Sequence, residues 1–316
     1  MKSSIRTVLV DCLGVREGEN VVVVVDPHPE RMGIGVELVA GARELNAEAV
    51  LVEISERESH GAEPPTTARE AILASDVFIA PTSKSLSHTT ARKDANARGV
   101  RAATMPQITR AMLERTMTAD YGEVKRRSQA IAALLTSGTE VTITSDKGTD
   151  LTFGIEGREG ISDDGDLREK GSFGNLPAGE GFIAPLEGTA TGSIVFDGSV
   201  VPFQELLEEP ITVSMADGFA VDFSGGRAEE WRSHMEPHGR DAFNLAELGV
   251  GTNEKATLTG NILEDEKIIG TVHLAFGDNH TFGGTVTVPS HLDGLVTAPT
   301  VEIDGKRILE AGKLLI

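Results

Sequence analysis

The chain has 316 residues, a length that predicts two domains, because single compact domains usually run to one or two hundred residues. Its net charge of −20 argues against nucleic acid and anionic membrane surfaces as partners, since both require clustered Lys and Arg. The single cysteine, Cys12, excludes an intrachain disulfide and lies on an apolar, helix-like face typical of a core position. Without a signal peptide or an apolar run of membrane-spanning length, a cytoplasmic location is expected.

The first half of the chain alternates strand and helix patterns. Short apolar or β-branched runs predict the strands, and apolar side chains at helical spacing predict the helices. In chain order these are a strand at 21–25, a helix at about 31–45, a strand at 49–54, a helix at 68–74, a strand at 77–81, a helix at 88–98, a strand at 100–105 and a largely helical stretch at 107–137. This order predicts an α/β domain with a parallel sheet covered by helices.

From Thr139 the pattern changes to short alternating strands separated by Gly and Asp. The predicted strands are 140–144, 150–153, 192–196, 211–215, 219–223, 255–258 and 272–276, with one short helix at 228–234. We therefore place the domain boundary near residue 138. An α/β domain is expected over 1–138 and a strand-rich, mixed α+β domain over 139–316.

Two glycines after the first strand match a dinucleotide-binding loop poorly. Gly33 and Gly35 follow the strand at 21–25, but Leu38 stands where the third glycine of that fingerprint belongs. The chain also has no Walker loop, nucleophile elbow or paired CxxC motif. The candidate chemistry therefore rests on histidines and acids.

Histidines and acids of the second half form a candidate metal site. His291 and Asp293 are two residues apart, and in an extended chain such side chains point the same way and would converge on one cation. His273 lies in a predicted strand, and Glu180 and Glu247 are acids among apolar residues and glycines. Burying an unpartnered carboxylate costs on the order of several kcal/mol, which a bound cation offsets. The alternative interpretation is a set of hydrogen-bonded core residues without an ion.

Several segments, spread in order over the chain, match a known family. They are residues 87–93, 105–106, 174–185, 246–253, 265–266, 273–277 and 291–293. On these segments the chain resembles the aminopeptidase T and aminopeptidase S family of metallopeptidases. The resemblance implies an α/β N-terminal domain, a metal-binding C-terminal domain and a homodimer. It also implies two divalent ions per chain (zinc, cobalt or manganese), held by Glu180, Glu247, His273, His291 and Asp293.

The first functional hypothesis is a metalloaminopeptidase, a hydrolase that releases N-terminal amino acids from small peptides by attack of a metal-activated hydroxide. Glu180 or Glu247 would be a ligand or would shuttle the proton, with Glu180 taken as the catalytic residue. The family tends to have a tyrosine a few residues beyond the position of Gly277, whereas this chain has Asp278, Asn279 and His280. His280 is then expected to act as a catalytic residue that stabilises the oxyanion, or to bind near the free amino group of the peptide. His88 of the first domain is expected to face the substrate.

The second hypothesis is a mononuclear Fe(II) dioxygenase acting on a small-molecule substrate. The same superfamily contains a ring-opening dioxygenase of dihydroxypyridine, which uses one Fe(II) on a His, His, Asp set. His273, His291 and Asp293 would satisfy that triad, with the two glutamates beside the ion or the substrate. The retained glutamates favour the peptidase and the missing tyrosine favours the dioxygenase. We take the peptidase as the main prediction, with a non-enzymatic binding protein as a third alternative.

Overall fold

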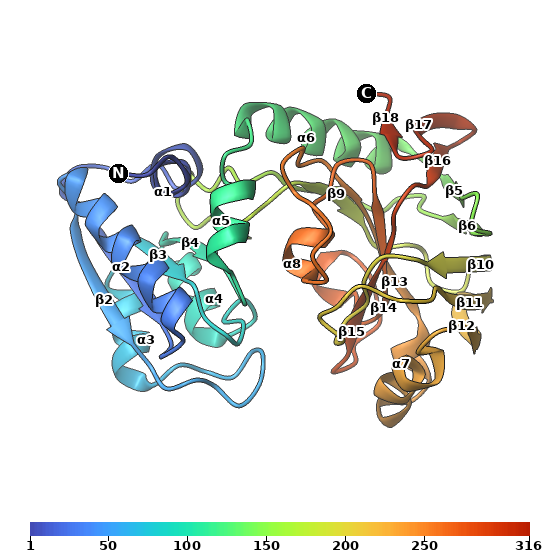
Figure 1. Cartoon of the computed structure of the whole chain (residues 1–316), viewed down its shortest axis with the longest axis horizontal. Coiled ribbons are helices and arrows are strands. Elements are labelled where there is room, and N and C mark those ends of the chain that lie inside the picture. Colours follow the sequence, from blue (N-terminus) through green and yellow to red (C-terminus); the bar gives the residue numbers. More distant parts are fainter. The chain divides into compact units, whose positions relative to one another are not determined.

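The computed structural model describes all residues, 1–316, and the chain divides into two compact units (Figure 1). The first unit comprises Met1–Gly122 and Gly165–Ala178, and the second comprises Glu123–Asp164 and Gly179–Ile316. Residue 138, the expected boundary, follows directly on the last residue of helix α6 (Tyr121–Ser137). The first unit thus includes a short segment that returns from the second half of the sequence.

The first unit is built on a parallel sheet in the order β2-β1-β3-β4-β8, which confirms the predicted α/β domain. Its valine-rich strand β1 (Asn20–Val25) is buried on both faces, as the unbroken β-branched run predicts. Gly35 of α2 (Pro29–Glu44) packs directly on this strand, since an added Cβ would lie 2.4 Å from a methyl group of Val25. The close approach of helix and sheet explains this glycine without a nucleotide.

The helices of the first unit surround this sheet, and Cys12 is buried as expected. The elements are α1 (Ser3–Arg6), a π-helical segment (Thr7–Cys12), β1, α2, β2 (Glu48–Glu53), α3 (Thr66–Leu73), β3 (Val77–Ala80), α4 (Thr90–Ala97), β4 (Arg101–Thr104), α5 (Arg110–Thr116) and β8 (Phe173–Asn175). The stretch predicted as largely helical over 107–137 contains two helices, α5 and α6, because the chain turns between Thr116 and Tyr121. No helix of the chain combines the length and the apolar character needed to cross a bilayer.

The second unit contains two antiparallel sheets on one shared core, in agreement with the predicted strand-rich, mixed character. The larger sheet has the order β12-β11-β10-β6-β5-β16-β17-β18 and the smaller has the order β15-β14-β13-β9-β7. Besides α6, the elements are β5 (Glu140–Thr144), β6 (Asp150–Gly154), β7 (Ile161–Asp163), β9 (Glu180–Ile183), β10 (Thr191–Phe196), β11 (Ile211–Ala216), β12 (Phe219–Ser224), α7 (Ala228–Met235), β13 (Leu245–Gly251), α8 (Ile262–Asp265), β14 (Val272–Gly277), β15 (His291–Val296), β16 (Thr300–Ile303), β17 (Lys306–Glu310) and β18 (Lys313–Leu314).

One predicted strand, at 255–258, is wrong. This segment is a loop whose backbone N–H groups bond side chains instead of a neighbouring strand. The N–H of Lys255 donates to Asn253, and the N–H of Thr257 donates to Glu264. Side-chain acceptors close to the segment along the chain thus compete successfully with sheet formation.

Trp231 of α7 anchors the core of the second unit, and Trp231→Phe is expected to destabilise it by about 2 kcal/mol. The indole is fully buried against the rings of Phe196, Phe223 and Phe276. Its Nε1–H donates to the carbonyl of Val201 at 2.7 Å, and phenylalanine would leave that carbonyl unpaired. Thermal unfolding should show a fall in Tm of roughly 4–8 °C. An unchanged Tm would contradict this role of the indole.

Candidate metal centre

Four adjacent strands of the smaller sheet carry the five predicted ligands. Glu247 of β13 and Asp293 of β15 both pair with Ala275 of β14, so the three residues form one row across the sheet. His273 and His291 lie two positions along β14 and β15 from this row, and side chains two apart share a face. The register therefore brings these four side chains to one face of the sheet.

Glu180 joins this face from β9, where it pairs with Gly251 of β13. Gly251 lies four positions from Glu247 along the strand, so it belongs to the same face. The intervening positions Gly249 and Ala275 are small, which leaves room for the imidazoles and carboxylates. An added Cβ at Gly249 would lie 2.0 Å from Cε1 of His273, so the imidazole occupies the space that this glycine leaves open.

The opposite face of the same strands is apolar and packs in the core of the unit. The residues on this face are Ile183, Leu248, Val250, Val272, Leu274, Phe276 and Val296. A slip of one residue in any strand would exchange the two faces and bury the charged side chains in that core. The hydrophobic pattern thus determines which residues form the site.

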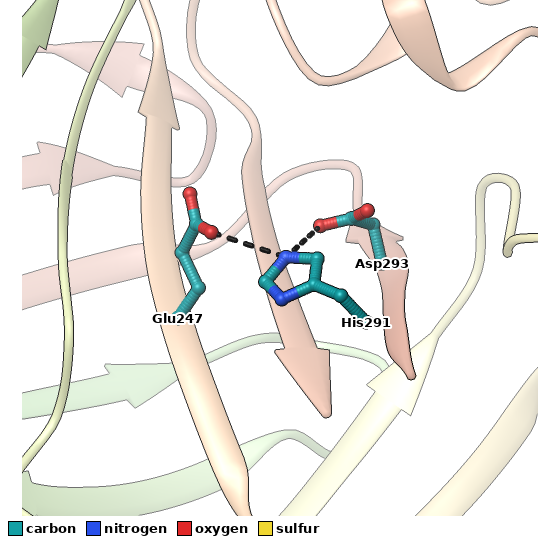
Figure 2. Close-up of side chains that lie close together, drawn as sticks. All are labelled: Glu247, His291 and Asp293. Carbon is teal, nitrogen blue, oxygen red and sulfur yellow. Dashed lines mark ion pairs between the residues drawn. The ribbon is translucent and has the colours of Figure 1, made fainter. Parts of the chain in front are cut away.

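The carboxylate of Glu247 lies between the two imidazoles. Its Oε2 is 3.2 Å from Nε2 of His291, and its Oε1 is 3.4 Å from Nε2 of His273. Asp293 Oδ1 is 3.4 Å from the same nitrogen of His291, and Figure 2 shows this ring nitrogen between the two carboxylates. For comparison, neighbouring ligands of an octahedral ion with bonds of about 2.1 Å lie about 3.0 Å apart.

The hydrogen bonding of His291 suits a metal ligand. Its Nδ1 lies 2.8 Å from the backbone carbonyl oxygen of Asp278, which can only accept a hydrogen bond. Nδ1 therefore carries the hydrogen, and a neutral imidazole then turns the lone pair of Nε2 toward Glu247 and Asp293. Three electron-rich atoms facing one another repel unless a cation lies among them. The side chains present therefore fit a divalent metal ion.

Glu180 contributes a second indication. Its Oε1 accepts a hydrogen bond from Lys267 at 2.6 Å, whereas its Oε2 is buried without any hydrogen-bond partner. This oxygen lies 3.3 Å from Nε2 of His273, although the geometry does not make a hydrogen bond. A buried carboxylate oxygen without a donor is costly, and a bound cation nearby would offset that cost.

The pKa shifts of the site show that its carboxylates stabilise positive charge on the two imidazoles. Burial lowers the pKa of His273, but the negative charges of Glu180 and Glu247 outweigh burial and raise it to about 9. Burial also lowers the pKa of His291, yet Asp293 and Glu247 raise it well above its ordinary value. Burial raises the pKa of Glu180 to about 8, against the opposing charges of Lys267 and His273.

Glu247 shows the opposite direction. Burial acts to raise its pKa, but hydrogen bonds and charge from His273 and His291 outweigh burial and hold it well below its ordinary range. Glu247 is therefore ionised throughout the physiological pH range, and protons on the two imidazoles balance its charge. A metal ion would have to replace those protons.

Metal binding at pH 7 is accordingly expected to release at least one proton per ion, and metal affinity should rise between pH 6 and pH 9. Because the pKa values of the imidazoles are raised, each ligand nitrogen must lose a proton before it binds an ion. The metal affinity should therefore rise about tenfold per pH unit for each proton released. Calorimetric Mn²⁺ titrations in two buffers of different protonation enthalpy measure the released protons. An affinity independent of pH over this range would contradict the expectation.

His280 and His88 lie outside this group of side chains. His280 begins a short 3₁₀ turn, His280–Phe282, and its exposed imidazole pairs through Nδ1 with Asp278 at 2.7 Å. His88 is exposed in the turn that precedes α4, in the first unit. Their expected catalytic and substrate-facing roles stay predictions.

The structure adds three residues that were not predicted from the sequence, namely Asp163, Glu266 and Lys267. Glu266 presents a ligand atom within 4.8 Å of those of His273 and Asp293. Lys267 contacts Glu266, Glu180 and Asp163, with its ammonium fully buried. The only signal in the sequence was the acidic pair at 265–266, which is one of the segments that carry the family resemblance. Asp265 itself accepts hydrogen bonds from Ser199, Thr259 and Gly260 and thereby holds the loop.

Comparisons with known proteins give a consistent result. A family model described as 2,5-dihydroxypyridine 5,6-dioxygenase matches residues 1–316. The protein of that name from Pseudomonas putida KT2440 is 26% identical over 204 residues, which span 60% of this chain and only 58% of the relative. A solved structure of the 2,5-dihydroxypyridine dioxygenase from the same organism has a TM-score of 0.85 at 21% identity, covering 99% of this chain and 96% of that chain. Wild-type AmpT from Thermus thermophilus has a TM-score of 0.71 at 16% identity, covering 99% of both chains.

These matches confirm the fold class, and they correct the main functional prediction. The interpretation as a metalloaminopeptidase, and with it the assignment as a hydrolase, is wrong. The family model and the curated relative are both described as 2,5-dihydroxypyridine 5,6-dioxygenase. The physical reason for the error is that both chemistries use imidazoles and carboxylates around a divalent ion. The similarity to AmpT extends to the fold.

Proposed function

Because this chain belongs to the 2,5-dihydroxypyridine 5,6-dioxygenase family, we propose that it opens the ring of a dihydroxylated pyridine with dioxygen at a single Fe(II) ion. The family match over the whole chain supports the reaction class. The alignment with the curated relative spans 58% of that protein, so the substrate is a proposal about this chain. Zinc, cobalt and manganese, expected for a peptidase, give way to iron in this proposal.

The observation that carries the proposal is the set of two imidazoles and a carboxylate on one face of the sheet. His273, His291 and Asp293 would hold the ion, since two histidines and one carboxylate with open positions are typical of Fe(II) oxygenases. When bound, Fe(II) supplies the one-electron chemistry that lets dioxygen react with an organic ring. The hydrogen bond from Nδ1 of His291 to the carbonyl oxygen of Asp278 would orient this imidazole.

The two glutamates, Glu180 and Glu247, would contact the substrate. Burial raises the pKa of Glu180 to about 8, a direction that favours the exchange of a proton by its carboxyl group. This property suits a group that takes the proton of a ring hydroxyl and returns it. Glu247, which is ionised and lies between the imidazoles, would orient them and accept a hydrogen bond from the substrate.

The expected binding partners of the chain belong to this proposal as well. The partner is a small molecule, and no nucleic acid or membrane is expected to bind a chain of net charge −20. The homodimer and the substrate-facing role of His88 also belong to the proposal. Light scattering would report the dimer, and His88→Ala would raise KM if the imidazole contacts the substrate.

Oxygen uptake tests the proposed reaction. Protein purified without oxygen and loaded with Fe(II) should consume one O₂ per molecule of 2,5-dihydroxypyridine, with loss of the ring absorbance. Aminoacyl-nitroanilides, tested with zinc or cobalt in parallel, should not be hydrolysed. An iron-loaded protein that consumes no oxygen with hydroxypyridines or catechols would refute the proposal.

A further inference from the structure

Lys267 is a buried ammonium held by three carboxylates. Its side chain is 2% exposed, and its Nζ lies 2.6 Å from Glu180, 2.8 Å from Glu266 and 3.3 Å from Asp163. An ammonium has three protons to donate, and one carboxylate is present for each of them. Lys267 is therefore a fixed internal cation, unlike a surface lysine that moves in solvent.

The carboxylates that hold Lys267 also belong to the candidate metal centre. Glu266 presents an oxygen within 4.8 Å of the ligand atoms of His273 and Asp293. Glu180 binds Lys267 through Oε1, and its Oε2 lies 3.3 Å from Nε2 of His273. The ammonium and the metal site thus share one group of acids.

The charges of this group are suited to two cations. Five carboxylates converge here, from Asp163, Glu180, Glu247, Glu266 and Asp293, and the only nearby permanent cation among the described contacts is Lys267. Without the lysine, the buried carboxylate of Glu180 and the partly buried carboxylates of Asp163 and Glu266 would all lose their shared ammonium partner, which is unfavourable. Carboxylate oxygens at such spacing are also the ligands of hard divalent ions.

We propose that Lys267 takes the place of a second metal ion and so limits the centre to one divalent ion per chain. By binding Oε1 of Glu180, the ammonium also turns Oε2 toward His273, which makes Lys267 a positioning residue. The inference rests on the metal centre of the proposed function, but it does not depend on which reaction that centre catalyses.

Metal stoichiometry tests this role directly. Mn²⁺ titration with elemental analysis of the dialysed full-length protein should give one ion per chain for the wild type and two for Lys267→Met. Methionine matches the lysine side chain as far as Cε and removes the ammonium group. The matched control is Lys147→Met, because Lys147 pairs with Asp197 at 2.7 Å but is exposed. This control should bind one ion.

Each outcome bears on the proposal. Two ions on the wild type, or one ion or none on folded Lys267→Met, would overturn it. If Lys267→Met is purified unfolded, added Mn²⁺ should restore its circular dichroism, since the ion replaces the missing charge. Failure of Mn²⁺ to restore folding would also overturn the proposal. Oxygen uptake is measured separately, so a different reaction at the same centre leaves this test unaffected.

Discussion

His291→Ala is expected to abolish metal binding at micromolar concentrations and to lower the rate of ring opening by on the order of 10³-fold or more. The imidazole is the one side chain whose Nε2 faces both Glu247 and Asp293, at 3.2 and 3.4 Å. Alanine removes this ligand and leaves two carboxylates facing each other. Elemental analysis measures the bound iron, and an oxygen electrode measures turnover with 2,5-dihydroxypyridine.

A matched control is His238→Ala, which removes an exposed histidine of the same unit. It should keep the metal content and the turnover of the wild type. Circular dichroism should confirm that both variants fold. Wild-type iron content in His291→Ala would show that the ion is bound elsewhere, and the proposed centre would have to be abandoned.

Gly249→Ala is expected to weaken metal binding by on the order of 10–100-fold, as changes to groups that orient metal ligands do. The added Cβ would lie 2.0 Å from Cε1 and 2.2 Å from Nε2 of His273. The imidazole is buried on the strand opposite Gly249, so it has to tilt away from the carboxylate of Glu247. Mn²⁺ titration measures the change in Kd.

Gly154→Ala provides the control, because its added Cβ would approach no atom closer than a methyl group of Leu186, at 3.3 Å, with Thr189 at 3.7 Å. Gly154 also ends a strand of the second unit, β6. Metal affinity should stay within about twofold of the wild type in this variant, as expected of a substitution far from the ligands. Equal affinities for Gly249→Ala and the wild type would show that His273 does not bind the ion in the position that the structure shows.

Local patterns were sufficient for the N-terminal part of the first unit, but they did not predict its returning strand β8 and were less sufficient for the second unit. The valine run of β1 could only be a strand buried on both faces, and the alternation of strands and helices required a parallel sheet. Strand β13, which carries Glu247, was not predicted, because its glycines and mixed polarity weaken the alternating signal. The segment 255–258 has the composition of a strand, but nearby side chains satisfy its backbone.

The ligand types were readable from the sequence, whereas the choice of chemistry was not. The spacing of His291 and Asp293 predicted convergence, and the structure brings both side chains beside Glu247. The same ligands serve hydrolases and oxygenases, so the interpretation as a peptidase followed a family resemblance and was wrong. The family model that matches residues 1–316 distinguished the dioxygenase from the peptidase.

The sequence by itself determined the fold class, the acidic character of the chain and the residue types of the candidate metal centre, because these depend on local periodicity and composition. Only the tertiary structure decided that Lys267 enters the group of acids and that Glu247 lies between two imidazoles. The register of strands far apart in the chain sets those distances. Pairing depends on which faces can be buried together, and no single segment contains that information.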